Sequence, residues 1–184
     1  MKSPKARIAV VAIILCLAIT VVAAAQEKAP DWSYQGGSAG EMLGSSLAVL
    51  EDANGDGYSD LAIGSPHYNC SASGEQYCEG KITVCYGGAD GLSDNCWEWA
   101  SNTRRAFAGR TIADAGDVNG DGYTDLLLSS GMGWEVTGRF WIFYGSASGY
   151  DSNNMWQYTH PENADYGVYV GKGGDFNHDG YSDV

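Results

Sequence analysis

The sequence predicts an all-β fold, a β-propeller built from four-stranded antiparallel blades. The first observation is a nine-residue loop pattern that occurs three times, at residues 52–60, 117–125 and 175–183, with offsets of 65 and 58 residues. The second is that about four extended segments accompany each copy, which is typical of propeller blades. The third is composition, because 26 glycines and 12% aromatic residues favour short strands and tight turns over helices.

The strands beside each loop are predicted from short local patterns. Leu47 and Val49 alternate with polar residues before the first loop, as expected of a strand. The apolar runs 61–63 and 126–128 follow a loop directly, which is typical of a strand that is buried on both faces. No segment has a helical period longer than two turns.

The remaining strands of each repeat lie further from the loop. Alternation over residues 81–86 predicts a third strand, and residues 139–144 match this segment in the second repeat. A Trp-x-aromatic pattern predicts the outer strand at residues 32–34, 97–99 and 156–158. The expected blades cover residues 40–99, 104–158 and 163–184, the last of them incomplete.

The first 25 residues have the layout of a secretory signal peptide, which leaves residues 26–184 for the propeller. Three basic residues precede an apolar run over residues 8–22, and alanines 23–25 offer a cleavage site. An uncleaved membrane anchor is the alternative, because residues 8–25 are barely long enough to span a bilayer. The expected location is therefore secreted or on the cell surface.

The charge of the chain excludes two classes of partner. The formal net charge is −13, so the surface is expected to repel nucleic acid and anionic lipid. Nine of the 23 acidic residues lie in the three loops, where bound cations would offset part of this charge. The expected partner is an extracellular protein or polysaccharide.

The three loops have the ligand spacing of a calcium site. Oxygen-bearing side chains stand at positions 1, 3, 5 and 9, and the glycine at position 6 permits a sharp turn. The tyrosine at position 7 should offer its backbone carbonyl while its ring packs outside the loop. Oxygen-only ligation favours Ca²⁺ over zinc or copper. The expected ligands are Asp52, Asn54, Asp56, Tyr58, Asp60, Asp117, Asn119, Asp121, Tyr123, Asp125, Asp175, Asn177, Asp179, Tyr181 and Asp183.

Two other interpretations of the loops are weaker. An EF-hand needs a glutamate at position 12, where this chain has Ile63 and Leu128. Asn-Gly and Asp-Gly also form plain hairpin turns, but three copies in one frame favour metal sites. Because the ligands end at position 9 and a strand begins there, the metal is expected to stabilise the fold.

Four cysteines follow the signal segment, and an even number predicts disulfides in an exported chain. Three pairings are possible. Cys70 and Cys78 lie where the first repeat is seven residues longer than the second, whereas Cys85 and Cys96 lie on strands that should pair. The favoured pairing is therefore Cys70–Cys78 and Cys85–Cys96. A metal or redox site is the alternative, although a Cys-x-x-Cys spacing is missing.

The remaining candidate residues do not predict catalysis. Histidines 67, 160 and 178 stand at unrelated positions of the repeat and are expected on the surface. The tryptophans recur at strand positions, which favours packing between blades over a sugar-binding platform. These tryptophans are Trp97, Trp99, Trp134, Trp141 and Trp156.

The repeat resembles the FG-GAP repeat of integrin α-subunit propellers and of related secreted proteins. In that family a Phe-Gly strand precedes Asp-x-Asn-x-Asp-Gly-x-x-Asp, and the next apolar strand ends in Gly-Ala-Pro. The corresponding segments here are Leu43-Gly44 and Gly64-Ser65-Pro66 in the first copy, Phe107-Ala108 and Ser129-Ser130-Gly131 in the second, and Tyr166-Gly167 in the third.

The resemblance implies a ring of seven blades in which the Trp32 segment completes the last blade. About two and a half blades are present, so the chain is expected to be a fragment of a longer protein. The implied function is a calcium-stabilised binding or adhesion module for protein or carbohydrate ligands, not an enzyme, with its ligand face opposite the calcium loops. The alternatives are the propeller part of a secreted polysaccharide lyase or phospholipase, and a structural surface-layer protein.

Overall fold

The computed structural model describes residues 32–70, 78–130, 138–160 and 169–184. The predicted signal peptide lies outside these residues, as do Trp134 and the Tyr166-Gly167 pair. The chain divides into two compact units, 1–33 and 34–184, and all strands belong to the second unit. Within the described ranges, no helix is long and apolar enough to cross a membrane.

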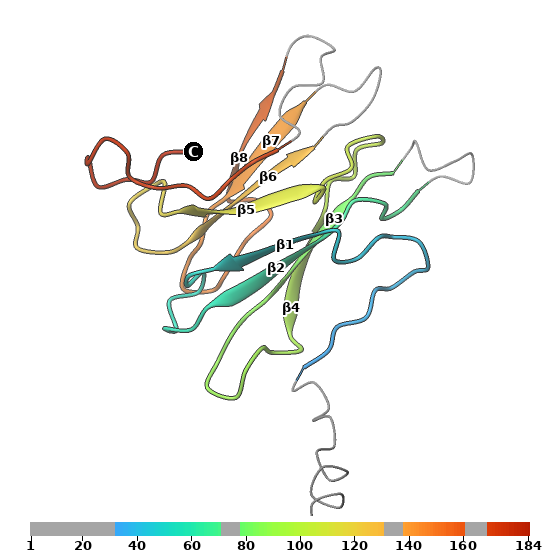
Figure 1. Cartoon of the computed structure of the whole chain (residues 1–184), viewed down its shortest axis with the longest axis horizontal. Helices are drawn as coiled ribbons and strands as arrows, with labels where there is room; N and C mark the ends of the chain where they lie inside the picture. The colour runs from blue at the N-terminus through green and yellow to red at the C-terminus, as the bar shows by residue number, and fades with distance from the viewer. Residues whose placement is uncertain (1–31, 71–77, 131–137, 161–168) are drawn as a thin grey trace, which may run out of the picture. The chain divides into compact units, whose positions relative to one another are not determined.

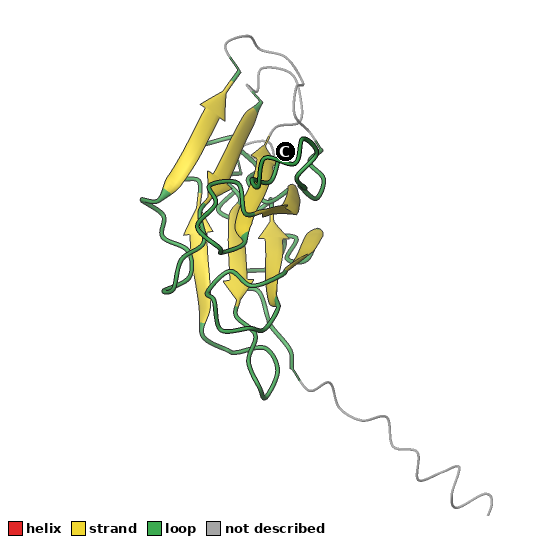
Figure 2. Ribbon diagram, turned by 90° about the vertical axis from the view of Figure 1, so that its left-hand side faces the viewer, coloured by secondary structure: helices red, strands yellow, loops and turns green. Residues whose placement is uncertain are grey.

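The second unit contains two four-stranded antiparallel sheets (Figure 1). The first consists of β1 (Ser46–Leu50), β2 (Asp60–Ser65), β3 (Lys81–Cys85) and β4 (Cys96–Ala100). The second consists of β5 (Thr111–Gly116), β6 (Asp125–Ser130), β7 (Arg139–Phe143) and β8 (Met155–Thr159). Each strand pairs with its neighbour in the chain, and the described residues form no helix (Figure 2). The all-β prediction and the four-stranded blades are confirmed.

The predicted metal loops connect the first two strands of each sheet. Leu50 of β1 pairs with Asp60 of β2, the last residue of the first loop. In the second sheet Gly116 pairs with Asp125, and the register shifts between Asp114 and Gly116. Such a bulge increases the local twist of a strand. Each loop is therefore attached directly to the inner edge of its sheet.

The two sheets pack against each other around one hydrophobic core. Alternate residues of the central strands fill it, including the fully buried Ile82 and Val84 of β3 and Leu126 and Leu128 of β6. The first strands of the two sheets, β1 and β5, lie next to each other. This packing is that of neighbouring propeller blades, because the sheets are stacked face to face with their inner strands adjacent.

Aromatic side chains fill the outer part of this interface. The ring of Trp99 lies 4.9 Å from that of Phe143 and 5.4 Å from that of Trp141, measured between centroids. Trp97 lies 5.3 Å from Phe143. All three contacts are edge-to-face, a favourable geometry for aromatic pairs. The prediction that the tryptophans pack between blades is confirmed for Trp97, Trp99 and Trp141.

The opposite face of the second sheet carries a second apolar cluster. Leu127 and Ile142 are buried there, and Val170 packs against them. Trp156 is 46% exposed, and its ring stacks on Tyr158 at 6.1 Å. Leu127, Ile142, Val170 and Trp156 border an apolar cavity of about 390 Å³. Trp156 therefore does not pack between the two described sheets, although it occupies the repeat position of Trp97.

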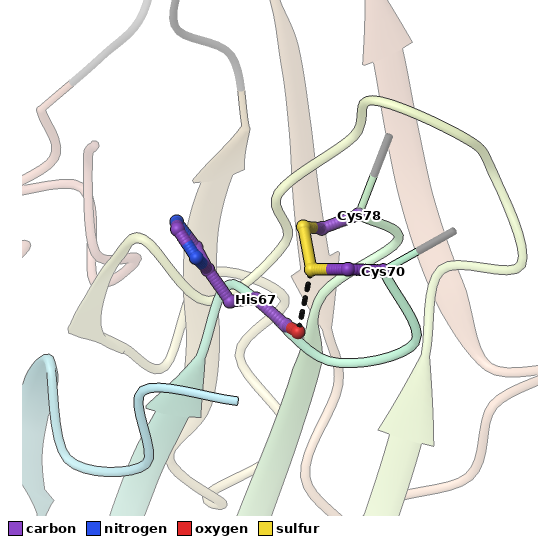
Figure 3. A group of neighbouring side chains, drawn as sticks. All are labelled: His67, Cys70 and Cys78. Atoms are coloured by element: carbon purple, nitrogen blue, oxygen red, sulfur yellow. Dashed lines mark hydrogen bonds between the residues drawn. A yellow bond between two sulfur atoms is a disulfide. The ribbon is translucent and has the colours of Figure 1, made fainter. Parts of the chain in front are cut away.

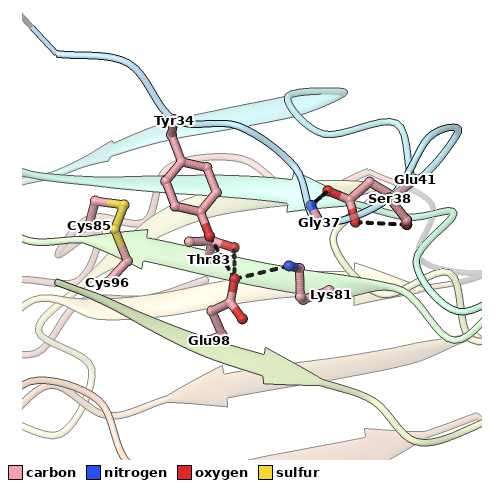
Figure 4. Close-up of polar contacts among 9 residues, drawn as sticks. All are labelled: Tyr34, Gly37, Ser38, Glu41, Lys81, Thr83, Cys85, Cys96 and Glu98. Carbon is pink, nitrogen blue, oxygen red and sulfur yellow. Dashed lines mark hydrogen bonds and ion pairs between the residues drawn. A yellow bond between two sulfur atoms is a disulfide. The ribbon is translucent and has the colours of Figure 1, made fainter. Parts of the chain in front are cut away.

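The predicted outer strand at residues 32–34 is wrong, because these residues are not in a strand. The Trp-x-aromatic pattern records side chains, whereas a strand also requires a neighbour with free backbone groups. Tyr34 instead donates its hydroxyl to Glu98 Oε1 at 2.7 Å (Figure 4). The same oxygen accepts hydrogen bonds from Lys81 Nζ at 2.9 Å and Thr83 Oγ1 at 3.3 Å. Tyr34 therefore contacts β4 through Glu98, which is itself bonded to two residues of β3.

Both predicted disulfides are present. Cys85 and Cys96 face each other across β3 and β4, so their disulfide joins the outer strands of the first sheet (Figure 4). The Cys70–Cys78 disulfide closes the longer connection between β2 and β3 (Figure 3). The two disulfides thus stabilise different parts of the first blade.

Candidate metal centre

The three loops lie on the same side of the second unit (Figure 1). The first joins β1 to β2, and the second joins β5 to β6. The third, residues 175–183, is closed by a bridge between Gly174 and Asp183. All three loops lie at the same end of the strands. The exposed acidic side chains of successive loops are therefore neighbours.

The first aspartate of each loop organises the loop backbone. Asp52 Oδ1 accepts hydrogen bonds from the N–H groups of Gly55 at 2.7 Å and Asp56 at 3.1 Å, and Oδ2 accepts one from Gly57 at 2.9 Å. Asp117 accepts the three equivalent bonds at 2.7, 3.0 and 2.7 Å. The backbone can curl around the carboxylate because Gly55 and Gly57 have φ values of 77° and 87°.

Positions 3 and 5 form a second repeated contact, in which the asparagine amide donates to the aspartate Oδ2. The pairs are Asn54–Asp56 at 3.0 Å, Asn119–Asp121 at 2.9 Å and Asn177–Asp179 at 3.0 Å. The aspartate is exposed in all three loops. Its carboxylate is therefore open to an ion that arrives from solvent.

The aspartates at position 9 are bound more tightly to the fold. Asp60 accepts hydrogen bonds from the N–H groups of Ala53 and Gly87, both at 2.8 Å. Asp125 accepts the equivalent bonds at 2.9 and 2.8 Å. Burial raises the pKa of Asp125 to about 6 and the pKa of Asp60 in the same direction, against the opposing effect of these N–H groups. Position 9 therefore ties each of the first two loops to the end of the third strand of its sheet.

Sequence reasoning assigned position 9 to the metal alone and missed this structural role. Its signal is the Tyr-Gly pair that follows β3 and β7, since Gly87 and Gly145 supply the N–H groups. Only the alignment of the repeats brings that pair to attention, because it lies about 20 residues or more after the aspartate it binds.

The donors of each loop fit a hard cation. They are three carboxylates, one amide oxygen and the backbone carbonyl at position 7, all of them oxygen. Calcium accepts six to eight oxygen ligands in a flexible arrangement. A carboxylate oxygen that accepts one N–H keeps a second lone pair for a metal. The residues present thus fit Ca²⁺, and they fit zinc or copper poorly.

A different group of potential metal ligands lies in the first blade. Among the described residues, His67, Cys70 and Cys78 bring ligand atoms within 4.8 Å of one another (Figure 3). Both sulfur atoms are joined in the disulfide, so they are not thiolates. The His67 ring packs near Phe107, with 5.8 Å between centroids. This group is therefore a disulfide beside a histidine.

Neighbouring loops are bonded to each other. Thr124, at position 8 of the second loop, donates its N–H to the carbonyl oxygen of Asp52 at 2.9 Å. Its hydroxyl accepts the N–H of Asp52 at 3.1 Å. In the third loop Ser182 donates its N–H to the carbonyl oxygen of Asp117 at 2.8 Å. The second and third loops therefore each hold the first aspartate of the loop before them.

The tyrosines at position 7 reinforce this contact. The Tyr123 ring covers Gly55, where an added Cβ would lie 2.6 Å from the ring, and Tyr181 covers Gly120, where the distance would be 2.5 Å. The expectation that these rings pack outside their own loop is met, but their partner is the preceding loop. Sequence reasoning missed this role, although the repeated tyrosine was a visible signal.

The opposite end of the blades has a different chemistry. All four arginines of the described residues lie at this end, at or before the starts of β5 and β7: Arg104, Arg105, Arg110 and Arg139. A cavity of about 230 Å³ opens there, lined by Met42, Ser45, Pro66, His67, Arg110, Thr111 and Tyr169. The Arg110 guanidinium makes no hydrogen bond or ion pair within the described ranges. The acidic loops and the arginines therefore occupy opposite ends.

The histidines do not come together in one site. His67 lines the cavity at the arginine end, whereas His178 stands in the third loop. His178 has a φ of 61°, at the position where the other two loops have Gly55 and Gly120. It is exposed, as predicted.

Comparison with known proteins identifies the repeats. The FG-GAP repeat family model matches residues 43–84 and 110–143, each of which spans a loop and the first three strands of a sheet. The chain is 31% identical to human integrin alpha-6 over 121 residues, which are 65% of this chain and 10% of that protein. It is 29% identical to Drosophila melanogaster integrin alpha-PS5 over 164 residues, which are 82% of this chain and 15% of that protein.

A third similar protein is integrin alpha-PS2 of Drosophila melanogaster, 34% identical over 125 residues. These residues are 64% of this chain and 9% of that relative. The chain thus spans about a tenth of the length of the relatives that it matches.

Proposed function

Because the chain is an integrin alpha-like FG-GAP repeat protein, we propose that it is an exported, calcium-stabilised propeller that acts as a binding or adhesion module. The ligand is an extracellular protein or carbohydrate. The observation that carries the proposal is a hydrogen-bond network that repeats in successive loops. It surrounds side-chain oxygens that could bind a metal, and it links one loop to the next. The similarity to integrin alpha subunits favours adhesion over the enzyme alternative.

Calcium would be held in each loop by the aspartates at positions 1, 5 and 9, the asparagine at position 3 and the carbonyl at position 7. Its chemistry is electrostatic, because a divalent cation neutralises carboxylates that otherwise repel one another. At a free concentration ten times the dissociation constant, one site adds about 1.4 kcal/mol to the free energy of unfolding. Three such sites would stabilise the inner edges of successive blades.

The ligand in this proposal meets the end with the arginines. Two features support this location: the 230 Å³ cavity between the segments that enter β1 and β5, and the guanidinium of Arg110 beside it, which has no partner among the described residues. The calcium end offers a dense negative charge and is occupied by structural contacts. In this proposal one end of the module binds the stabilising metal and the other end binds the ligand.

The test is binding of the full chain to immobilised extracellular proteins and polysaccharides, in calcium and in EDTA. We expect calcium-dependent binding to at least one of them. Arg110→Ala should weaken that binding at least about threefold, because it removes the cation that lines the cavity, and should leave the melting temperature unchanged. Turnover of a polysaccharide or phospholipid without stable binding would contradict the adhesion role and support the enzyme alternative.

A further inference from the structure

Asp52 is held at three points, and two of them belong to the next blade. Its carboxylate accepts the N–H groups of its own loop, but both of its backbone polar groups are bonded to Thr124. The direction of a carboxylate depends on the backbone that carries it. Thr124 therefore fixes the orientation of the first calcium ligand of another loop.

The second contact acts on the same ligand from the other side. The Tyr123 ring covers Gly55, whose N–H donates to Asp52 Oδ1. A shift of Gly55 would break that bond, and the ring leaves no space for such a shift on its side. The backbone of Asp52 and the donor to its carboxylate are both restrained by the second loop.

The same arrangement recurs one blade further along. Ser182 bonds the carbonyl of Asp117, and the Tyr181 ring covers Gly120, which donates to Asp117 Oδ1. The backbone bond and the ring contact each occur twice, which argues against a coincidence of packing. The first loop has the same residue types, Tyr58 and Ser59, but no preceding loop lies within the described residues for them to hold.

We propose that each calcium site is completed by the following blade, with Tyr123 and Thr124 as positioning residues for the first loop and Tyr181 and Ser182 for the second. This inference rests on the proposed calcium binding. It follows that an ordered loop raises the calcium affinity of the loop before it. By thermodynamic reciprocity, calcium in the earlier loop raises the affinity of the later one by the same factor.

The coupling has a physical route that requires no large movement. Calcium in the second loop orders Asp121 and Tyr123 because they are adjacent in its ligand set. An ordered Tyr123 and Thr124 then present a fixed ring and a fixed N–H to the first loop. The first loop then loses less conformational entropy when it binds its own ion. This smaller entropy loss appears as positive cooperativity between the two sites.

The experiment is a calorimetric titration of the full, calcium-depleted chain with calcium chloride. Three sites are expected, with a binding curve steeper than that of independent sites. Thr124→Ala removes the hydroxyl that accepts the Asp52 N–H. Besides any effect in the second loop, it should lower the calcium affinity of one further site, that of the first loop, by about fivefold. Ser59→Ala makes the matching change in the first loop and should leave all affinities within about twofold of the original.

Tyrosine variants test the ring contact separately. Tyr123→Ala and Tyr58→Ala remove the same side chain from the same loop position, so any effect within a variant's own loop is common to both. We expect Tyr123→Ala to weaken calcium binding at one more site than Tyr58→Ala does. Tyr123→Phe, which keeps the ring, should restore the original titration and so exclude a general loss of folding.

The outcomes separate the inference from the function on which it rests. If the unaltered chain binds no calcium, the proposed calcium stabilisation fails. If it binds calcium but Thr124→Ala matches Ser59→Ala, and Tyr123→Ala matches Tyr58→Ala, the sites are independent and this inference is wrong. Equal losses of melting temperature in calcium and in EDTA for Tyr123→Ala would likewise assign Tyr123 to packing alone.

Discussion

At the scale of single residues, the loops show how one repeated sequence serves two purposes. The exposed aspartate at position 5 is available to a cation, whereas the aspartate at position 9 of the first two loops is buried and also binds the backbone at the end of the third strand. The carboxylate at position 9 is therefore part of the fold before any metal arrives. Its replacement would disturb both the loop and the sheet.

Position 4 offers a prediction that compares two loops of the same chain. His178 adopts a φ of 61°, a conformation that costs a non-glycine residue about 1 kcal/mol or more. His178→Gly should therefore stabilise the protein by up to about 1 kcal/mol, after allowance for the greater freedom of glycine in the unfolded chain. Chemical denaturation with urea measures the change.

The reverse change is the control. Gly120→Ala places a Cβ 2.5 Å from the Tyr181 ring at a φ of 76°, so it should destabilise the protein by about 1–3 kcal/mol. A stabilising Gly120→Ala would show that the contact between the loops is not made in solution, whereas a strongly destabilising His178→Gly would contradict the cost assigned to the φ of His178.

At the scale of elements, the strands were predictable because their patterns are local. The apolar run 126–128 follows a loop with fixed spacing, and β6 occupies that place. The segment 32–34 failed because its aromatic pattern does not report whether a partner strand exists. The contact between Tyr123 and Gly55 could not be predicted because aligned repeats show which residues are equivalent and not which residues touch across a blade boundary.

The outer edge of the first sheet depends on the Cys85–Cys96 disulfide. This bond joins a residue pair across β3 and β4 and closes a connection of 11 residues. Replacement of both cysteines by serine should lower the free energy of unfolding by about 2–4 kcal/mol, since the unfolded chain regains the freedom of that loop. Thermal unfolding of the variant and of the unaltered chain measures the loss of stability. The unaltered chain is also unfolded in the presence of a small dithiol, which reduces its disulfides.

The Cys70–Cys78 pair is the comparison for that experiment. It lies in a connection outside the sheet and closes a loop of similar length, with a sequence separation of 8. Peptide mapping without reduction should recover both predicted linkages. Recovery of any other pairing would contradict the register of β3 and β4.

At the scale of the whole molecule, the repeat of the blades separates the acidic and basic residues. Acidic loops gather at one end of the blades and arginines at the other, although the chain as a whole has a net charge of −13. The sequence revealed the repeat and its loop chemistry, and the strand order then assigned each group to an end. The proposed ligand end rested on the family resemblance alone, because the loops at that end differ between the repeats.

The central claim is that calcium holds these blades together, and thermal unfolding of the full chain tests it most directly. Three sites at ten times their dissociation constant would add about 4 kcal/mol, which corresponds to a rise of about 10 °C in melting temperature. Calcium should produce this rise, EDTA should reverse it, and the same concentration of magnesium should produce a much smaller one. An identical melting temperature in calcium and in EDTA would contradict the account.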